Sequence, residues 1–181
     1  MELVGPPRLV WRACLYSSLV IGLVLTCVQR PNAQQSGPIA SFNFDAGGSI
    51  ISDLSGHGND GSCTPGSTCP AFSAAGGHTL GAYNFASNGN YIELANEANF
   101  DFTTQFSITL WMKTNGFTNA WEQLVGKGDS AWAIERQDTQ NTLSFTTFSA
   151  AGASDNLVGT VNVANNAWHH VAVVYLSLIH I

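Results

Sequence analysis

The segment FSITLWMKT, residues 106–114, decides the fold class. Its side chains form two alternating sets along the chain, one being Phe106, Ile108, Leu110 and Met112 and the other Ser107, Thr109, Trp111 and Lys113. Successive side chains of an extended strand point to opposite faces, so alternation with a period of two is typical of a half-buried strand. The segment therefore predicts a β-strand with its apolar face in a core.

Similar short runs follow one another from Ile39 onward, separated by clusters of Gly, Asn, Ser and Asp. Runs of this kind bounded by turn residues are typical of strands, and no stretch has the spacing of an amphipathic helix. The sequence therefore predicts an all-β sandwich or closed barrel. The predicted strands are IASFNF (39–44), GAYNFA (81–86), YIELA (91–95), FSITLWMKT (106–114), EQLVGKG (122–128), WAIERQ (132–137), TLSFTTF (142–148) and WHHVAVVY (168–175).

The composition limits the class of protein. Of the 181 residues, 45% are hydrophobic and only 10% are charged, which excludes a disordered chain and a coiled coil. Six basic residues stand against 12 acidic ones, and the basic residues form no cluster. Proteins that bind nucleic acids need clustered Lys and Arg to neutralise phosphates. We therefore expect one folded domain that binds no nucleic acid.

Residues 1–33 predict a secretory signal peptide. Arg8 and Arg12 precede an apolar run, Ala13 to Val28, which is short for the roughly 20 residues of a membrane-spanning helix. Ala33 supplies a small residue at which cleavage can occur. The prediction is a secreted or cell-surface protein with no stable membrane span after cleavage.

Two alternatives for this N-terminal segment are an uncleaved membrane anchor and lipid attachment at Cys27. After cleavage at Ala33, residues 34–38 would form a short linker to the domain. The remaining chain has 3 basic and 11 acidic residues, a formal net charge of −8. The mature protein is therefore expected to be acidic.

Cys63 and Cys69, in GSCTPGSTCP, are the two cysteines that remain after signal removal. Export and an even cysteine count predict a disulfide between them. A zinc site is the weaker interpretation, because such sites usually need a second cysteine pair or His ligands. The closed loop is small, so we expect the bond to stabilise the fold by at most about 3 kcal/mol.

The segments FDAGGSIISDLSGHGNDG, YNFASNGNYIEL, FDFTTQFSITLWMKT, LVGKGDSAWAIE and NAWHHVAVVY follow one another in this order within residues 39–175. Together they resemble a concanavalin A-like lectin/glucanase domain of the laminin G type. The resemblance implies a jelly-roll sandwich of two antiparallel sheets that acts outside the cell as a recognition module. Such domains usually continue with further strands, so we expect the domain to be incomplete and residues 176–181 not to be its native continuation.

The segment DLSGHGNDG, residues 53–61, carries oxygen ligands and a flexible backbone of the kind that calcium prefers. The resemblance implies calcium ligands from the side chain of Asp53 and the carbonyl oxygens of His57 and Asn59. Ala86 stands where relatives often have an Asp, which removes one possible anionic ligand. The alternative is a glycine-rich turn held by side-chain hydrogen bonds.

Trp121 lies beside a predicted loop together with Asn115 and Asn119. Sugar-binding sites combine an aromatic side chain with amide or carboxylate hydrogen bonds, so these three residues are predicted to bind a ligand. The other tryptophans that fall within strand motifs are predicted to lie in the core: Trp111, Trp132 and Trp168.

The sequence has no catalytic arrangement. Glu135 and Asp138 are three residues apart and would point to opposite faces of a strand, whereas retaining glycosidases hold two carboxylates about 5 Å apart. His169 and His170 are adjacent in a strand and therefore would not share a metal ion.

We therefore predict a lectin-like extracellular recognition module that binds a glycan, with calcium as a possible cofactor, and no enzyme. One alternative is an adhesion or structural domain that binds an extracellular protein and no sugar. Another is an accessory domain of a secreted glycoside hydrolase.

Overall fold

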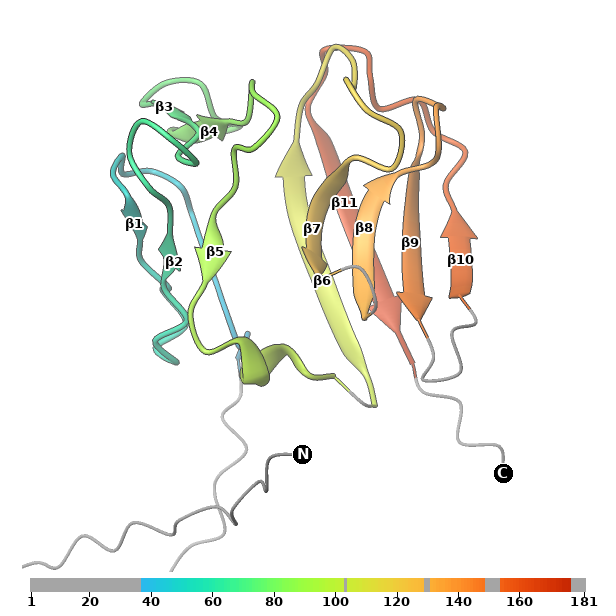
Figure 1. Ribbon diagram of the computed structural model, residues 1–181, viewed down its shortest axis with the longest axis horizontal. Coiled ribbons are helices and arrows are strands. Elements are labelled where there is room, and N and C mark those ends of the chain that lie inside the picture. The colour runs from blue at the N-terminus through green and yellow to red at the C-terminus, as the bar shows by residue number, and fades with distance from the viewer. Residues whose placement is uncertain (1–36, 103, 129–130, 149–153, 177–181) are drawn as a thin grey trace, which may run out of the picture. The chain divides into compact units, whose positions relative to one another are not determined.

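The structure is a computed structural model that describes residues 37–102, 104–128, 131–148 and 154–176 (Figure 1). The predicted signal peptide (1–33), most of the predicted linker and residues 177–181 of the C-terminal tail lie outside the described residues. Within the described ranges, no helix has both the length and the apolar character needed to cross a membrane.

The described residues form strands and one short 3-10 helix, which confirms the predicted all-β class. In chain order the elements are β1 (Ile50–Ile51), β2 (Gly61–Ser62), β3 (Ala71–Ser73), β4 (Ala82–Asn84), β5 (Glu93–Leu94), η1 (Glu97–Phe100), β6 (Phe106–Met112), β7 (Gln123–Lys127), β8 (Trp132–Arg136), β9 (Leu143–Phe148), β10 (Ser154–Val158) and β11 (His169–Tyr175). The predictions missed β1, β2, β3 and β10. These strands are short or polar, so they lack a long alternating pattern.

The predicted strand IASFNF (39–44) is wrong. Among the described residues, the segment makes one main-chain hydrogen bond, from Leu54 N to Ser41 O at 2.8 Å, and Phe44 has a φ of 57°. A bulky residue in this left-handed region interrupts an extended strand. The segment is therefore a connection (blue in Figure 1) that pairs with no strand of the described part of the chain.

Hydrogen bonds group the strands into antiparallel sheets of the orders β1-β2-β5, β3-β4, β11-β6 and β10-β9-β8-β7. The longest pairing joins β6 and β11 over seven residue pairs, from Phe106 opposite Tyr175 to Met112 opposite His169. The sandwich is confirmed, because the β11-β6 and β10-β9-β8-β7 sheets pack on a shared core. The hydrogen bonding divides the strands among four sheets instead of two continuous ones.

The core lies between β6 and β11 on one side and β8 and β9 on the other. Its buried centre consists of Trp132, Ile134, Phe145 and Val173. Phe106, Ile108 and Leu110 pack against this centre from β6, and the strand alternates between half-buried and exposed residues along its length. The predicted period of two and the core position of Trp132 are therefore confirmed.

Trp111 was predicted to lie in the core, and this prediction is wrong. The same alternation that points Leu110 inward points Trp111 outward, and its side chain is 49% exposed. Its ring stacks on His78 with ring centres 3.8 Å apart, and it lies opposite His170 across the β6–β11 pair. Trp168, the third tryptophan predicted in the core, is half-buried and meets His78 edge to face.

The predicted disulfide between Cys63 and Cys69 is confirmed. It closes a turn directly after β2, in which the carbonyl oxygen of Thr64 accepts hydrogen bonds from the N–H groups of Ser67, Thr68 and Cys69. The bond therefore holds a local turn and joins no distant parts of the chain.

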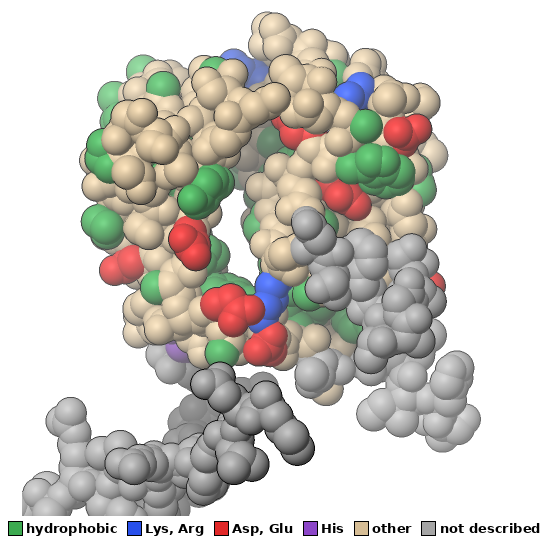
Figure 2. Space-filling model, in the orientation of Figure 1, with side chains coloured by type: hydrophobic (Ala, Val, Ile, Leu, Met, Phe, Trp, Pro, Cys, Tyr) green, Lys and Arg blue, Asp and Glu red, His purple; other side chains and the backbone are tan. Residues whose placement is uncertain are grey.

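β5 and β6 are consecutive strands, but no hydrogen bonds join them. Figure 2 shows an opening between the part of the molecule that carries β5 and the part that carries β6. An ion pair links the two parts instead: Lys127 of β7 bonds to Asp101 and lies with its Nζ 2.9 Å from Glu97 Oε1. These hydrogen bonds raise the pKa of Lys127.

Candidate ligand-binding site

The predicted ligand residues lie in the loop of residues 113–122, which connects β6 to β7. Glu122 organises this loop from inside, because its Oε2 accepts hydrogen bonds from the N–H groups of Thr118 at 2.8 Å and Asn119 at 3.1 Å. Burial works to raise the pKa of Glu122, but these bonds and the nearby charge of Arg136 lower it overall. The carboxylate therefore stays charged and fixes the backbone of the loop.

Arg136, at the end of β8, fixes the same loop from outside. Its Nη1 donates a 2.8 Å hydrogen bond to the carbonyl oxygen of Asn119, and its Nε donates another of 2.8 Å to the carbonyl oxygen of Gln140. The guanidinium also lies over the ring of Phe117, 5.4 Å from its centre. A planar guanidinium with several donors suits such a role better than a flexible ammonium group.

Trp121 lies near the end of the loop, and its ring is exposed. Its side chain is 45% exposed, and its main-chain N–H donates a 3.3 Å hydrogen bond to the carbonyl oxygen of Asp138. Its φ of 57° is uncommon for a bulky residue and persists only where the surroundings impose it. The hydrogen bonds of Glu122 and Arg136 to the backbone of Thr118 and Asn119 supply that constraint, so the backbone that carries the exposed indole is fixed before any ligand arrives.

The structure brings Asn119 and Trp121 into one constrained loop. The Nδ2 of Asn119 donates a 2.9 Å hydrogen bond to Asn88 Oδ1, which lies in the connection after β4. Asn115 lies exposed earlier in the loop and takes no part in these contacts. Two of the three predicted ligand residues are thus near each other in the chain and in the same hydrogen-bonded loop, and their role stays a prediction.

The sequence analysis missed a polar face of the β10-β9-β8-β7 sheet next to this loop. Glu135 is only 7% exposed, and its Oε1 accepts a 2.8 Å hydrogen bond from Thr146 Oγ1 of β9. Ser144 is directly opposite Glu135 across the two strands and is 2% exposed. The alternation of polar and apolar residues in TLSFTTF indicates such a face. Glu135 was weighed only as a catalytic partner of Asp138, which lies exposed after β8.

The predicted calcium loop is held together by the carboxylate of Asp53. Its Oδ1 accepts hydrogen bonds from the N–H groups of Ser41 and Ser55, and its Oδ2 accepts from Ser55 Oγ and the N–H of Asn59, at 2.7 to 3.0 Å. Burial works to raise the pKa of Asp53, but these hydrogen bonds outweigh it and hold the pKa well below its usual range. The bonds are those of the alternative interpretation, a turn organised by its own side chains.

The same loop buries Asn59 completely. Its Nδ2 donates to the carbonyl oxygen of Ile39 at 2.8 Å, and its Oδ1 accepts from Asn99 Nδ2 at 2.8 Å. The ring of His57 lies with Nδ1 3.0 Å from Ser55 Oγ. Because four donors already face the oxygens of Asp53, a calcium ion bound there would have to displace some of them, so this geometry does not fit calcium. Calcium binding at this loop, as predicted from the sequence, is left to experiment.

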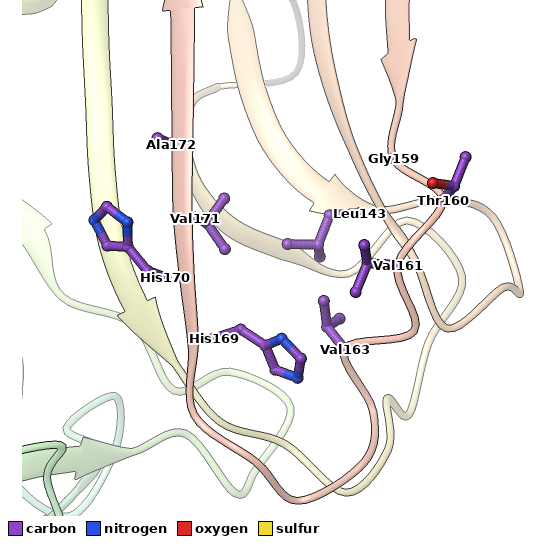
Figure 3. A pocket seen from close by; sticks show the side chains of 9 residues that line it. All are labelled: Leu143, Gly159, Thr160, Val161, Val163, His169, His170, Val171 and Ala172. Atoms are coloured by element: carbon purple, nitrogen blue, oxygen red, sulfur yellow. The ribbon is translucent and has the colours of Figure 1, made fainter.

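The two adjacent histidines of β11 point to opposite sides of the strand, as expected (Figure 3). His169 lies 2.8 Å through its Nε2 from Asn165 Oδ1, whereas His170 lies beside Trp111. A cavity of about 260 Å³ adjoins this part of β11, and its lining is mainly apolar, with Leu143, Val161 and Val163 among its side chains. The two imidazoles do not converge on one point in it.

Comparison with known proteins shows which family the chain belongs to. The model of a family described as the concanavalin A-like lectin/glucanases superfamily matches residues 86–177, just over half of the chain. Among solved structures, the binding domain of Paraclostridial Mosquitocidal Protein 1 is similar at 17% identity with a TM-score of 0.57. The match covers 74% of this chain and 35% of that chain, so it shows a shared fold. A search of curated proteins gives no match. The chain belongs to the concanavalin A-like lectin/glucanase superfamily.

Proposed function

We propose that the protein is an extracellular recognition module that binds carbohydrate through the loop of residues 113–122. The observation that carries the proposal is the exposed ring of Trp121, which sits in a loop fixed by Glu122 and Arg136. Because the backbone of this loop is already fixed, a sugar that stacks on the ring orders less of the chain when it binds. The amide of Asn119 lies in the same loop and supplies polar groups that bond sugar hydroxyls.

Two further observations support the proposal. The family includes lectins by its description, and the similar solved structure is described as a binding domain. The disulfide between Cys63 and Cys69 and the predicted signal peptide favour an extracellular location. The proposal assigns no catalysis to the chain: Glu135 is buried, Asp138 is exposed beyond the end of β8, and the two carboxylates do not form a pair.

The test is a glycan array probed with the secreted chain and with two tryptophan variants. Trp121→Ala removes the proposed stacking surface, and Trp111→Ala is the matched control because Trp111 is similarly exposed but lies on β6. We expect Trp121→Ala to weaken glycan binding by at least about tenfold, the equivalent of about 1.4 kcal/mol, and Trp111→Ala to leave it unchanged. Equal binding by Trp121→Ala and the unmodified chain would contradict the proposal.

A protein-binding adhesion domain is the second candidate. The observation that favours it is the number of large apolar side chains at the surface, such as Leu157 and Val161 at 69% and 62% exposure. Exposed apolar patches are typical of protein contact surfaces. In that case the array would show no glycan binding, whereas immobilised extracellular matrix proteins would retain the chain. An accessory role beside a glycoside hydrolase would require the glycan binding that the array measures.

A further inference from the structure

The turn of residues 87–90, between β4 and β5, carries an Asn-Gly pair at the surface (Figure 1). The N–H of Asn90 donates a 3.0 Å hydrogen bond to the carbonyl oxygen of Ser87, so Asn88 and Gly89 form the two corners of a β-turn. Gly89 has a φ of 101°, a conformation that favours glycine, and a Cβ added there would meet no atom within 4 Å. Both corner residues are exposed, so water reaches this backbone.

An asparagine followed by glycine can lose its side-chain amide without an enzyme. The main-chain nitrogen of the glycine gives up its proton and attacks the side-chain carbonyl carbon, because glycine has no side chain to obstruct the approach. A cyclic succinimide forms, and the side-chain nitrogen leaves as ammonia. Water then opens the ring at either of its two carbonyl carbons. The product is an aspartate or an isoaspartate, in which the main chain runs through the former side chain.

The sequence contains two Asn-Gly pairs, and the structure distinguishes them by the state of the attacking nitrogen. In Asn115-Gly116 the N–H of Gly116 donates a 3.1 Å hydrogen bond to Thr114 Oγ1, which keeps its proton in place. The N–H of Gly89 donates to no acceptor in the described part of the chain. The turn of residues 87–90 is therefore the more reactive of the two pairs.

Two side chains of the loop of residues 113–122 polarise the carbonyl group under attack. The Oδ1 of Asn88 accepts a 2.9 Å hydrogen bond from Asn119 Nδ2, and the hydroxyl of Thr118 lies 3.3 Å from the same oxygen. Attack makes this oxygen negative in the tetrahedral intermediate, and donors that already face it stabilise that charge. The exposed side chain of Asn115 accepts no such hydrogen bond from the described residues.

We propose that Asn88 is a site of spontaneous deamidation, and that its conversion to aspartate or isoaspartate loosens the loop of residues 113–122. The consequence for ligand binding rests on the proposed function, whereas the modification itself does not. The hydroxyl of Thr118 faces Asn88 Oδ1 and also lies 3.0 Å from Glu122 Oε2, so the new carboxylate stands close to the one that fixes the loop. Like charges this close repel each other. Isoaspartate also displaces the acceptor, because its main chain is longer by a carbon atom.

Peptide mapping by mass spectrometry tests the modification in the full chain, incubated in warm, mildly alkaline buffer and sampled over weeks. We expect the peptide with Asn88 to gain the mass of an amide exchanged for a carboxylic acid, in separable aspartate and isoaspartate forms. Conversion at Asn88 should be several times faster than at Asn115, the internal comparison in the same chain. Asn88→Gln keeps a side-chain amide but must close a larger ring, so it is the control and should stay intact at this position.

Asn88→Asp tests the effect on the loop, because it carries the new charge in every molecule. Hydrogen–deuterium exchange without ligand should find faster exchange in residues 113–122 of this variant and of the aged chain. Titration calorimetry with the glycan that binds most tightly on the array should find about threefold weaker binding by Asn88→Asp. Aged and fresh samples of Asn88→Gln should not differ in either measurement.

The outcomes separate this inference from the proposed function. If Asn88 stays intact, or converts no faster than Asn115, the inference is wrong. If Asn88 converts but the amides of residues 113–122 exchange at an unchanged rate, the proposed effect on the loop is disproved. If conversion does speed this exchange but neither fresh nor aged chain binds any glycan on the array, the inference stands and the proposed function is overturned.

Discussion

Arg136 donates a 2.8 Å hydrogen bond through Nη1 to the carbonyl oxygen of Asn119, and this bond ties the end of β8 to the loop that carries Trp121. The same guanidinium covers the ring of Phe117. Together with Glu122, Arg136 thus sets the position of the backbone around the proposed ligand-binding tryptophan, although it lies 17 residues from Asn119 along the chain.

We expect Arg136→Lys to weaken glycan binding by about three- to tenfold, because lysine keeps the charge but loses the fork of donors that holds several carbonyl oxygens at once. The melting temperature should fall by only a few degrees, since the contacts are at the surface. Titration calorimetry and thermal unfolding measure the two effects. Lys127→Arg, on β7 and outside the loop of residues 113–122, is the control and should leave the affinity unchanged. Unchanged affinity in Arg136→Lys would show that the loop is fixed by other means.

The disulfide is predicted to have a local effect on stability. Replacing Cys63 and Cys69 by Ser should lower the free energy of unfolding by at most about 3 kcal/mol, because the bond closes a small turn. Chemical denaturation measures the difference, and mass spectrometry without reductant should find the bond in secreted protein. Two free thiols in the secreted protein would contradict the prediction.

Asp53 predicts a specific dependence of stability on pH. Its pKa is lower in the folded chain than the value of about 3.9 in an unfolded one, so its stabilising contribution is complete above that value and is lost as the pH falls below about 4. Asp53→Asn should therefore lose about 2 kcal/mol of stability at pH 7, and the gap to the unmodified chain should narrow at pH 3. Urea unfolding at both pH values measures it. A gap of the same size at pH 3 would show that the carboxylate charge is not what holds the loop.

The calcium prediction is tested on the same loop. Four donors face the oxygens of Asp53, so we expect the chain to melt at the same temperature with millimolar calcium and with a chelator. Calcium held by Asp53 and the carbonyl oxygens of His57 and Asn59 would instead stabilise the fold, by about 2.7 kcal/mol at a hundredfold excess over Kd. Asp53→Ala would abolish that gain. A calcium-dependent rise that Asp53→Ala removes would establish the site.

The sequence predicted the fold where one physical signal dominates. In β6 the alternation of Phe106, Ile108 and Leu110 with polar residues predicts both the strand and its buried face. The structure confirms both. The same alternation places Trp111 on the exposed face of the strand. The prediction that Trp111 lies in the core followed the general preference of tryptophan for buried positions, and it is wrong. Burial follows from the position of a residue in the period, and residue type alone is the weaker guide.

The candidate site was less predictable, because it depends on contacts between distant segments. Trp121 and Asn119 are neighbours in the sequence and were found together, whereas the bond from Arg136 to Asn119 needs the fold. The pairing of Glu135 with Ser144 needs the register of two strands, which no local pattern gives.

Hydrogen–deuterium exchange with and without the glycan that binds most tightly on the array tests the central claim most directly, because it locates the ligand on the chain. The account predicts that bound sugar protects the amides of residues 113–122 and leaves the loop of residues 53–61 unchanged. Trp121→Ala should lose this protection, whereas Trp111→Ala should keep it. Protection confined to residues 53–61 or to β6 and β11, with none in residues 113–122, would contradict the account.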